Sequence, residues 1–247
     1  MDNIISSFNV RASLYSDIWD NASSDDFKTI KLHKDVREHL IAIAKDFIES
    51  LGIDTFVIED ILFVGSLANY NWSEYSDVDL HIVIDKEKVN DDLDLVDEFF
   101  TAKKEVYNLK HNIKVKGFDV ELYVQDIKEE LDASDGIYSI LYNKWRKQPS
   151  KDKAPINKKD IIKKVKDFTK KLDDIQKEEE PDAKLLKLKK LKEKIRAYRK
   201  SGLNATGEYS TENLVFKYLR RSGYMDKLAD LGIDVKDEFL SLENEQY

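Results

Sequence analysis

A glycine-serine pair, a ten-residue spacer and an Asp-Val-Asp triplet limit what this chain can fold into more than any other feature. The pattern runs from Gly65 and Ser66 to Asp77 and Asp79, which enter the apolar segment 80–84. Because side chains alternate along a strand, the two aspartates would share one face while their neighbours face the core. Two carboxylates about 4–6 Å apart repel by roughly 3–4 kcal/mol at an effective dielectric near 20, and a divalent cation reverses that repulsion. We therefore expect a metal ion here.

The donor atoms on offer indicate which metal this is. The chain has no cysteine, and His81 is the one imidazole near the aspartates. Oxygen ligands favour a hard ion such as Mg²⁺ over zinc. His81 falls on the same strand face as the two acids, where we interpret it as a hydrogen-bonded histidine lining a cleft rather than as a ligand.

The glycine-serine step predicts a contact with phosphate. Residues 61–64 form a short apolar run typical of a buried strand, after which Gly65 allows the backbone to turn and to approach a ligand closely. Backbone N–H groups at such a turn, together with the Ser66 hydroxyl, favour an anion. The two features together predict a site for a metal-bound triphosphate.

These residues resemble the signature of the DNA polymerase beta-type nucleotidyltransferase superfamily, and Gly-Ser-Leu-Ala-Asn-Tyr-Asn-Trp is similar to uncharacterised members found in tailed phages. The resemblance covers about residues 55–126. It implies that Asp77 and Asp79 bind two Mg²⁺ ions, with Mn²⁺ as an alternative, and that Gly65 and Ser66 contact the nucleotide phosphates. It also implies a third carboxylate on a later strand.

The third carboxylate should come from residues 118–125, the next run with a strand pattern. Asp119 and Glu121 share one face of that strand, so either could reach the metals. Glu121 is slightly favoured because it interrupts the centre of the strand, where an unpaired charge is costly, whereas Asp119 follows a turn-like Lys-Gly step. The family usually has Asp at this position, so a Glu is a departure. The sequence leaves both residues open.

Length and composition predict an α/β (α+β) protein. We expect a small mixed sheet with flanking helices in residues 1–135, and a helical domain in residues 136–247 that begins with a helix at 137–146. There is no apolar stretch long enough to span a bilayer, no cleavable signal sequence at the start and no disulfide framework. These features predict a cytoplasmic protein that does not enter membranes. The oligomeric state is left open.

The net charge of −8 hides an uneven distribution. Residues 1–150 contain 17 basic and 30 acidic side chains, residues 151–200 contain 19 and 10, and residues 201–247 contain 5 and 9. Apolar residues at three- and four-residue steps predict that the Lys-rich segment is a helical hairpin, with Pro181 in the first turn of its second helix. Its lysines fit either a solvated surface or a contact with RNA or another nucleic acid.

The C-terminal segment offers three further cations. Ser201-Gly202-Leu203 is expected to stop a helix, and the next helix begins with Ser210 as its cap. Lys217, Arg220 and Arg221 then share one helical face. They could clamp a triphosphate or an acceptor phosphate, with ordinary surface ion pairs as the equal alternative.

The hypothesis that unites these features is an Mg²⁺-dependent nucleotidyltransferase. Such an enzyme moves a nucleoside monophosphate from an NTP to an acceptor hydroxyl and releases pyrophosphate. The sequence leaves the acceptor open among an RNA 3′ end, a protein hydroxyl, a small molecule and a second nucleotide, and the Lys-rich segment favours RNA. The alternatives are a catalytically silent, antitoxin-like regulator that binds a nucleotide or partner, and a nucleic-acid-binding adaptor.

Overall fold

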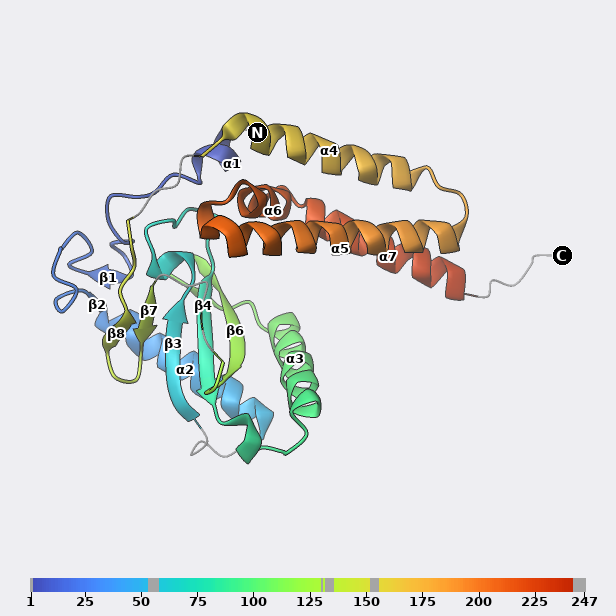
Figure 1. Cartoon of the computed structure of the whole chain (residues 1–247). Helices are drawn as coiled ribbons and strands as arrows, with labels where there is room; N and C mark the ends of the chain where they lie inside the picture. Colours follow the sequence, from blue (N-terminus) through green and yellow to red (C-terminus); the bar gives the residue numbers. More distant parts are fainter. Residues whose placement is uncertain (1, 53–57, 130, 132–135, 152–155, 242–247) are drawn as a thin grey trace. The chain divides into compact units, whose positions relative to one another are not determined.

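A computed structural model describes residues 2–52, 58–129, 131, 136–151 and 156–241, and the chain divides into two compact units (Figure 1). Residues Asn9–Asp152 form one unit, called here the sheet unit. Residues Met1–Phe8 and Lys153–Tyr247 form the other, the helical unit. The predicted α/β class is confirmed. None of the helices in the described ranges is long and apolar enough to cross a membrane.

A six-stranded mixed sheet organises the sheet unit. Its strands, in the spatial order β5-β6-β4-β3-β7-β8, are Lys114–Val115, Phe118–Asp126, Val78–Ile84, Ile58–Val64, Ile137–Ser139 and Lys144–Lys147. Strands β4 and β6 pair in parallel, and every other neighbouring pair is antiparallel. A parallel pair needs a crossover, and helix α3 (Leu93–Lys110) lies in the segment that connects β4 to β6.

One face of the sheet is covered by apolar side chains. Helix α2 (Lys34–Leu51) lies across this face (Figure 1), and its buried positions, such as Leu40 and Phe47, belong to one core with Leu80 and Ile82 of β4. A two-stranded sheet of β1 (Trp19–Asp20) and β2 (Lys31–Leu32) adds further side chains to this core. The residues of β4 that alternate with the core positions therefore face the opposite side, where the acids lie.

The helical unit contains the predicted hairpin. Helices α4 (Lys158–Gln176) and α5 (Pro181–Thr206) are followed by α6 (Thr211–Arg221) and α7 (Tyr224–Leu240), and a short α1 (Asp2–Ser6) joins them. Pro181 begins α5, and the Ser210 side chain caps α6 by accepting from the Asn213 N–H, as expected. The apolar positions of the hairpin form a separate core with those of α6 and α7.

Expectations about residues 1–8 and about the second half of the chain differ from the structure. Residues 137–146, expected to be helical, contribute β7 and β8 to the sheet, because Tyr138 and Trp145 pack against Trp19 in its core. The sheet unit therefore extends to Asp152, beyond the expected boundary at residue 135, and residues 1–8 belong to the helical unit.

Gly202 does not stop a helix, since α5 continues to Thr206. Instead, this glycine allows α5 and α6 to approach closely. A Cβ atom on Gly202 would lie 2.4 Å from the Cβ of Glu212.

Candidate metal centre

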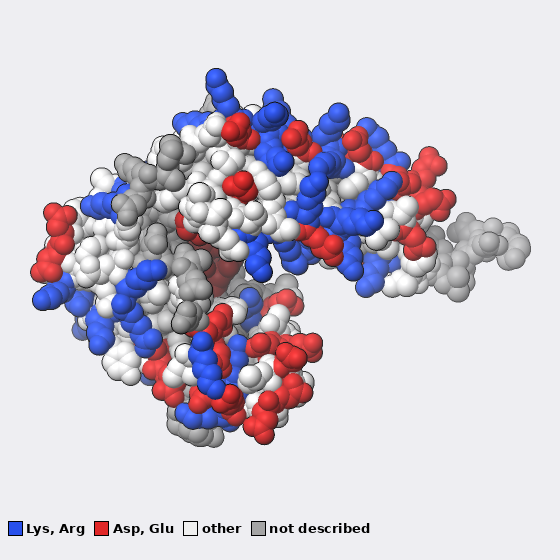
Figure 2. Space-filling model, in the orientation of Figure 1, with Lys and Arg blue, Asp and Glu red and all other residues white. Residues whose placement is uncertain are grey.

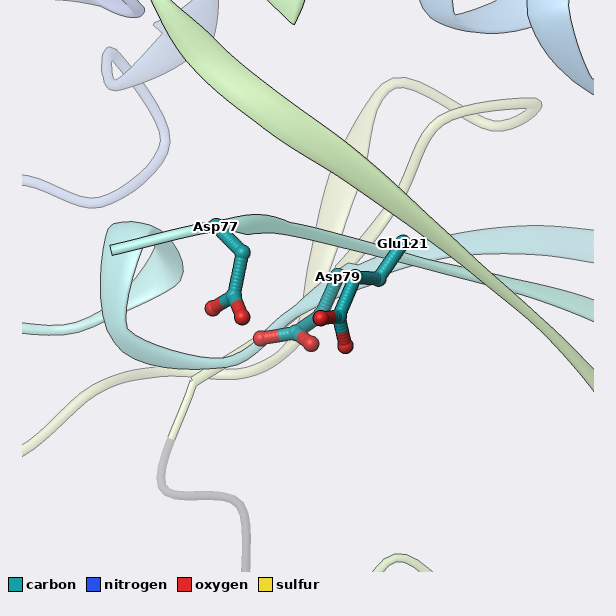
Figure 3. A group of neighbouring side chains, drawn as sticks. All are labelled: Asp77, Asp79 and Glu121. Atoms are coloured by element: carbon teal, nitrogen blue, oxygen red, sulfur yellow. The ribbon is translucent and has the colours of Figure 1, made fainter. Parts of the chain in front are cut away.

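Three carboxylates converge at one edge of the β4–β6 pair. Asp77, Asp79 and Glu121 each offer an oxygen atom, and these atoms all lie within 4.8 Å of one another (Figure 3). Asp79 and Glu121 are direct partners in the parallel register of β4 and β6, and Asp77 immediately precedes β4. Neighbouring strands lie about 4.8 Å apart, so this register is sufficient to bring the two side chains together. The strand pattern predicted the shared face of Asp77 and Asp79.

The alternation of buried and exposed positions explains why the acids face outwards. Val78 and Leu80 are fully buried, whereas Asp77 and Asp79 between them are partly exposed. Glu121 is exposed on β6 and is followed by the buried Leu122. The core thus holds both strands by their apolar side chains and leaves the carboxylates at the surface, accessible to a cation.

Asp119, the other candidate for the third carboxylate, does not join this group. Its side chain is 65% exposed and pairs with Lys114 Nζ at 2.5 Å. The two residues are partners in the antiparallel β5–β6 hairpin. Two residues further along β6, Glu121 instead lies opposite Asp79. The position of Glu121, and not that of Asp119, therefore suits the role of third ligand.

Gly65 lies directly beneath the Asp79 carboxylate. Its φ of +75° lies in the region that favours glycine, and a Cβ atom built on it would stand 1.6 Å from Oδ2 and 2.6 Å from Cγ of Asp79. The cause is the antiparallel register of β3 and β4, which places Val64 opposite Asp79. The expected turn at Gly65 is present, and the group that lies against it is the Asp79 carboxylate. The expected close contact of Gly65 with a ligand stays a prediction.

A hydrogen bond between two serine hydroxyls joins the two ends of the ten-residue spacer. Ser66 Oγ donates to Ser76 Oγ at 2.7 Å, and Ser76 Oγ accepts from the Ser73 N–H at 3.0 Å. The Asn69 side-chain amide also donates to the Gly65 carbonyl at 2.7 Å. These bonds fold the spacer back on itself and position Asp77, which directly follows Ser76. Sequence reasoning identified Ser66 and missed Ser76, although a serine at each end of the spacer was visible.

His81 is a hydrogen-bonded strand histidine, as we interpreted it. Its Nδ1 lies 2.9 Å from Oε1 of Gln125, whose amide nitrogen donates to the Glu129 carbonyl at 3.0 Å. Since the amide donates to Glu129, its oxygen faces the imidazole and accepts from Nδ1–H. Burial lowers the pKa of His81 and so favours the neutral imidazole.

A cavity of about 230 Å³ opens beside Asp79 and Glu121; its wall is made by Asp79, His81, Lys104, Glu121, Leu122, Tyr123 and Glu129. A second hollow of about 170 Å³ shares Lys104 and Tyr123 with it and reaches Lys86, which pairs with Asp97 at 2.5 Å. The Lys104 Nζ stands 5.7 Å from the centre of the Tyr123 ring.

Two lining residues of this cavity were not identified from the sequence. Tyr123 follows Glu121 by two residues on the same strand face, so the strand pattern could have indicated it. Nothing in the sequence indicated Lys104, which α3 brings to the site.

The three cations proposed near the C-terminus lie on α6, and the contacts of Lys217 and Arg221 are with residues of the helical unit. Lys217 Nζ pairs with Glu208 at 2.5 Å, and Arg221 donates to Ser7 Oγ at 2.7 Å. The Arg221 guanidinium also lies 5.1 Å from the centre of the Phe8 ring. Arg220 is exposed. Lys217 and Arg221 thus have structural partners, and their contact with a nucleotide stays a prediction.

Comparison with known proteins adds no relative. No family model, no curated protein and no solved structure matched the chain. The nucleotidyltransferase resemblance therefore depends on the motif residues and on the geometry they adopt.

Proposed function

We propose that the sheet unit is a nucleotidyltransferase that depends on a divalent metal and moves a nucleoside monophosphate from an NTP to an acceptor hydroxyl. The observation that supports this most is the convergence of Asp77, Asp79 and Glu121 within 4.8 Å, beside a glycine turn. Three like charges at this range repel one another, and a bound divalent cation would reverse that repulsion.

The donor set fits Mg²⁺ or Mn²⁺. All three side chains offer carboxylate oxygen, and the spread of 4.8 Å lies close to the span of ligands that share an ion or a pair of ions. When bound, the ions would neutralise phosphate charge and lower the pKa of the acceptor hydroxyl. The chain's own part is to hold the acids at a fixed separation, which the β4–β6 register achieves.

The glycine turn has a separate part in the proposal. Gly65 and Ser66 begin the segment that leaves β3, and their backbone N–H groups and the Ser66 hydroxyl are the proposed contacts of the triphosphate. Because the Asp79 carboxylate rests against Gly65, phosphate and metal ligands are adjacent. The acceptor oxygen would form a bond to the α-phosphorus and lose its proton to water. The bond from that phosphorus to the bridging oxygen breaks, and its electron pair leaves with pyrophosphate.

The cavity beside the acids can accommodate part of a substrate. It begins at Asp79 and Glu121 and continues past Tyr123 to Lys104. An aromatic ring with a cation beside it suits a flat or polar group such as a base or a sugar. We assign this cavity to the nucleoside or the acceptor, and take RNA as the first acceptor to test.

Label transfer tests the proposal. The purified protein is incubated with each α-labelled NTP, Mg²⁺ and total cellular RNA or protein, and incorporation is measured. We expect transfer by the wild-type protein and by Asp119→Asn, which changes an acid on the same strand, and loss of at least about 100-fold in Asp79→Asn.

The outcome also separates the proposal from a silent regulator. If NTP with Mg²⁺ raises the melting temperature but no acceptor becomes labelled, the chain is a nucleotide-binding module and the transferase proposal is wrong. Transfer that persists in the Asp77→Asn and Asp79→Asn double variant would contradict the assigned ligands.

A further inference from the structure

One side of the α4–α5 hairpin forms a basic groove. Its volume is about 400 Å³, and its lining residues are Lys171, Asp174, Ile175, Lys187, Lys190, Leu191 and Lys194. Ile175 and Leu191 belong to the core of the helical unit and make an apolar floor. Four ammonium groups thus surround one depression, and Figure 2 shows Lys and Arg side chains gathered over these two helices.

The charge of the groove is poorly balanced. Its one acid, Asp174, pairs with Lys177 at 3.6 Å, and Lys187 pairs with Glu178. Among the residues that the structure describes, none of Lys171, Lys190 and Lys194 forms an ion pair with a carboxylate. Residues 151–200 as a whole carry 19 basic against 10 acidic side chains. The segment that contains the groove therefore carries an excess of nine positive charges.

Lysines from the two helices approach each other across the groove. Burial and the neighbouring ammonium group of Lys194 lower the pKa of Lys171. Lys171 belongs to α4 and Lys194 to α5, so the hairpin itself holds like charges together. An anion placed between them would relieve this repulsion.

The extent of the groove favours a polymer over a single phosphate. Lys187 and Lys194 are seven residues apart on α5, which corresponds to about 10.5 Å along the helix. One phosphate cannot span that distance, whereas successive phosphates of a strand can. A lysine ammonium group is a point charge and does not form the bidentate hydrogen bonds that an arginine guanidinium makes with base edges. Binding should therefore be insensitive to the nucleotide sequence.

We propose that the basic groove binds the phosphate backbone of a single-stranded RNA. The choice of RNA over an acidic protein rests on the proposed nucleotidyl transfer, for which RNA is the first acceptor to test. The binding itself requires neither the carboxylate cluster nor a nucleotide. It can therefore succeed or fail independently of the enzyme activity.

A charge-matched pair of triple variants tests the groove. One carries Lys171→Gln, Lys190→Gln and Lys194→Gln. The control carries Lys166→Gln, Lys189→Gln and Lys192→Gln, exposed residues of the same two helices. At 100° per residue, the control positions fall on the opposite sides of α4 and α5 from the groove. Both variants lose the same charge, so only location differs.

Binding is measured by fluorescence anisotropy with a fluorescein-labelled single-stranded RNA of about 20 nucleotides, in EDTA and without NTP. We expect the groove variant to raise the Kd about tenfold or more at about 100 mM salt, and to flatten the slope of log K against log salt by about 2. The control variant should change the Kd by less than about threefold. Circular dichroism verifies that both variants keep their helices.

Several results would overturn the groove assignment. These are equal losses in the two triple variants, affinity that does not respond to salt, and failure of the wild-type protein to bind RNA while it binds poly-glutamate or anionic vesicles. The Asp77→Asn and Asp79→Asn double variant should bind RNA as tightly as the wild type. If it does and yet no NTP label is ever transferred, the groove stands and the transferase proposal fails.

Discussion

The carboxylate of Asp79 occupies the space where any side chain on Gly65 would begin. A Cβ at that position would overlap Oδ2 at 1.6 Å, and the φ of +75° at Gly65 adds strain for any other residue. Gly65 and Asp79 therefore pack directly against each other, although 13 residues separate them in the chain.

Substitution of Gly65 by alanine should displace Asp79 and abolish metal binding. We expect a destabilisation of about 2–4 kcal/mol in urea unfolding, from backbone strain and overpacking together. Gly117→Ala is the matched control, because Gly117 has a φ of +88° but no atom lies within 4 Å of its added Cβ. The control should cost about 1–2 kcal/mol and keep Mn²⁺ binding. Equal loss of Mn²⁺ binding in both variants would contradict the contact.

Ser76→Ala should loosen the spacer that carries Asp77. The Ser76 hydroxyl accepts from both Ser66 Oγ and the Ser73 N–H and is 8% exposed, so its loss leaves two donors without their partner. We expect about 1–2 kcal/mol of destabilisation and a lower rate of label transfer. Ser23→Ala, an exposed serine of the same unit, should leave both quantities within error. An unchanged rate in Ser76→Ala would show that the bond does not position Asp77.

Arg146→Ala should destabilise the sheet unit through β8. Arg146 Nη2 lies 2.6 Å from Oδ2 of the fully buried Asp60, which also accepts from Ser139 Oγ at 2.9 Å. Removal of the cation leaves a buried carboxylate without its ion pair. Because Arg146 is 44% exposed and water can partly replace it, we expect about 1–3 kcal/mol rather than the larger cost of a fully buried pair.

Lys147→Ala, the next residue on β8, is the control for Arg146 and should cost less than about 0.5 kcal/mol. Chemical denaturation followed by tryptophan fluorescence measures both variants. Similar stability of the two would show that the Asp60 pair contributes little.

The stability of the helical unit should depend on pH through Glu208. Burial raises the pKa of Glu208, but the ammonium group of Lys217 and nearby donors lower it by more, so the folded-state pKa lies below the ordinary 4.5. The unfolded chain therefore binds the proton more readily. The stabilisation of the folded state by ionised Glu208 is therefore complete above pH 4.5, and it is lost as the pH falls through the lowered pKa of Glu208.

Comparison with Glu208→Gln isolates this effect. The wild type should be about 1–2 kcal/mol more stable at neutral pH, and the difference should shrink below about pH 4. Urea unfolding followed by circular dichroism measures it. A difference that is constant across this range, or that grows on acidification, would contradict the lowered pKa.

Local periodicity predicted the parts of the site that lie within one segment. The shared face of Asp77 and Asp79 and the turn at Gly65 follow from neighbours in sequence. The choice between Asp119 and Glu121 could not be made in this way, because it depends on the register between β4 and β6. The register is set by contacts between strands that are distant in the sequence, so a pattern within one segment does not reveal it. A shift of two residues along β6 would place Asp119, rather than Glu121, opposite Asp79.

The error at residues 137–146 has a different cause. Tyr138, Tyr142 and Trp145 recur at four- and three-residue steps, which imitate a helical face. In the structure the decisive contacts are tertiary, since Trp145 stacks on Trp19 with ring centres 4.7 Å apart. Lys104 was missed for the same reason, because only the placement of α3 brings it to the cavity beside Glu121.

Direct titration with Mn²⁺ is the sharpest test of the carboxylate cluster. Isothermal titration calorimetry in the presence of a non-hydrolysable NTP analogue should give saturable binding for the wild type and for Asp119→Asn, and no measurable binding for Asp79→Asn or Glu121→Gln. If the wild type gives no heat with Mn²⁺ or Mg²⁺, or if Asp79→Asn binds as well as the wild type, the three acids are not a metal centre and the proposed chemistry fails with it.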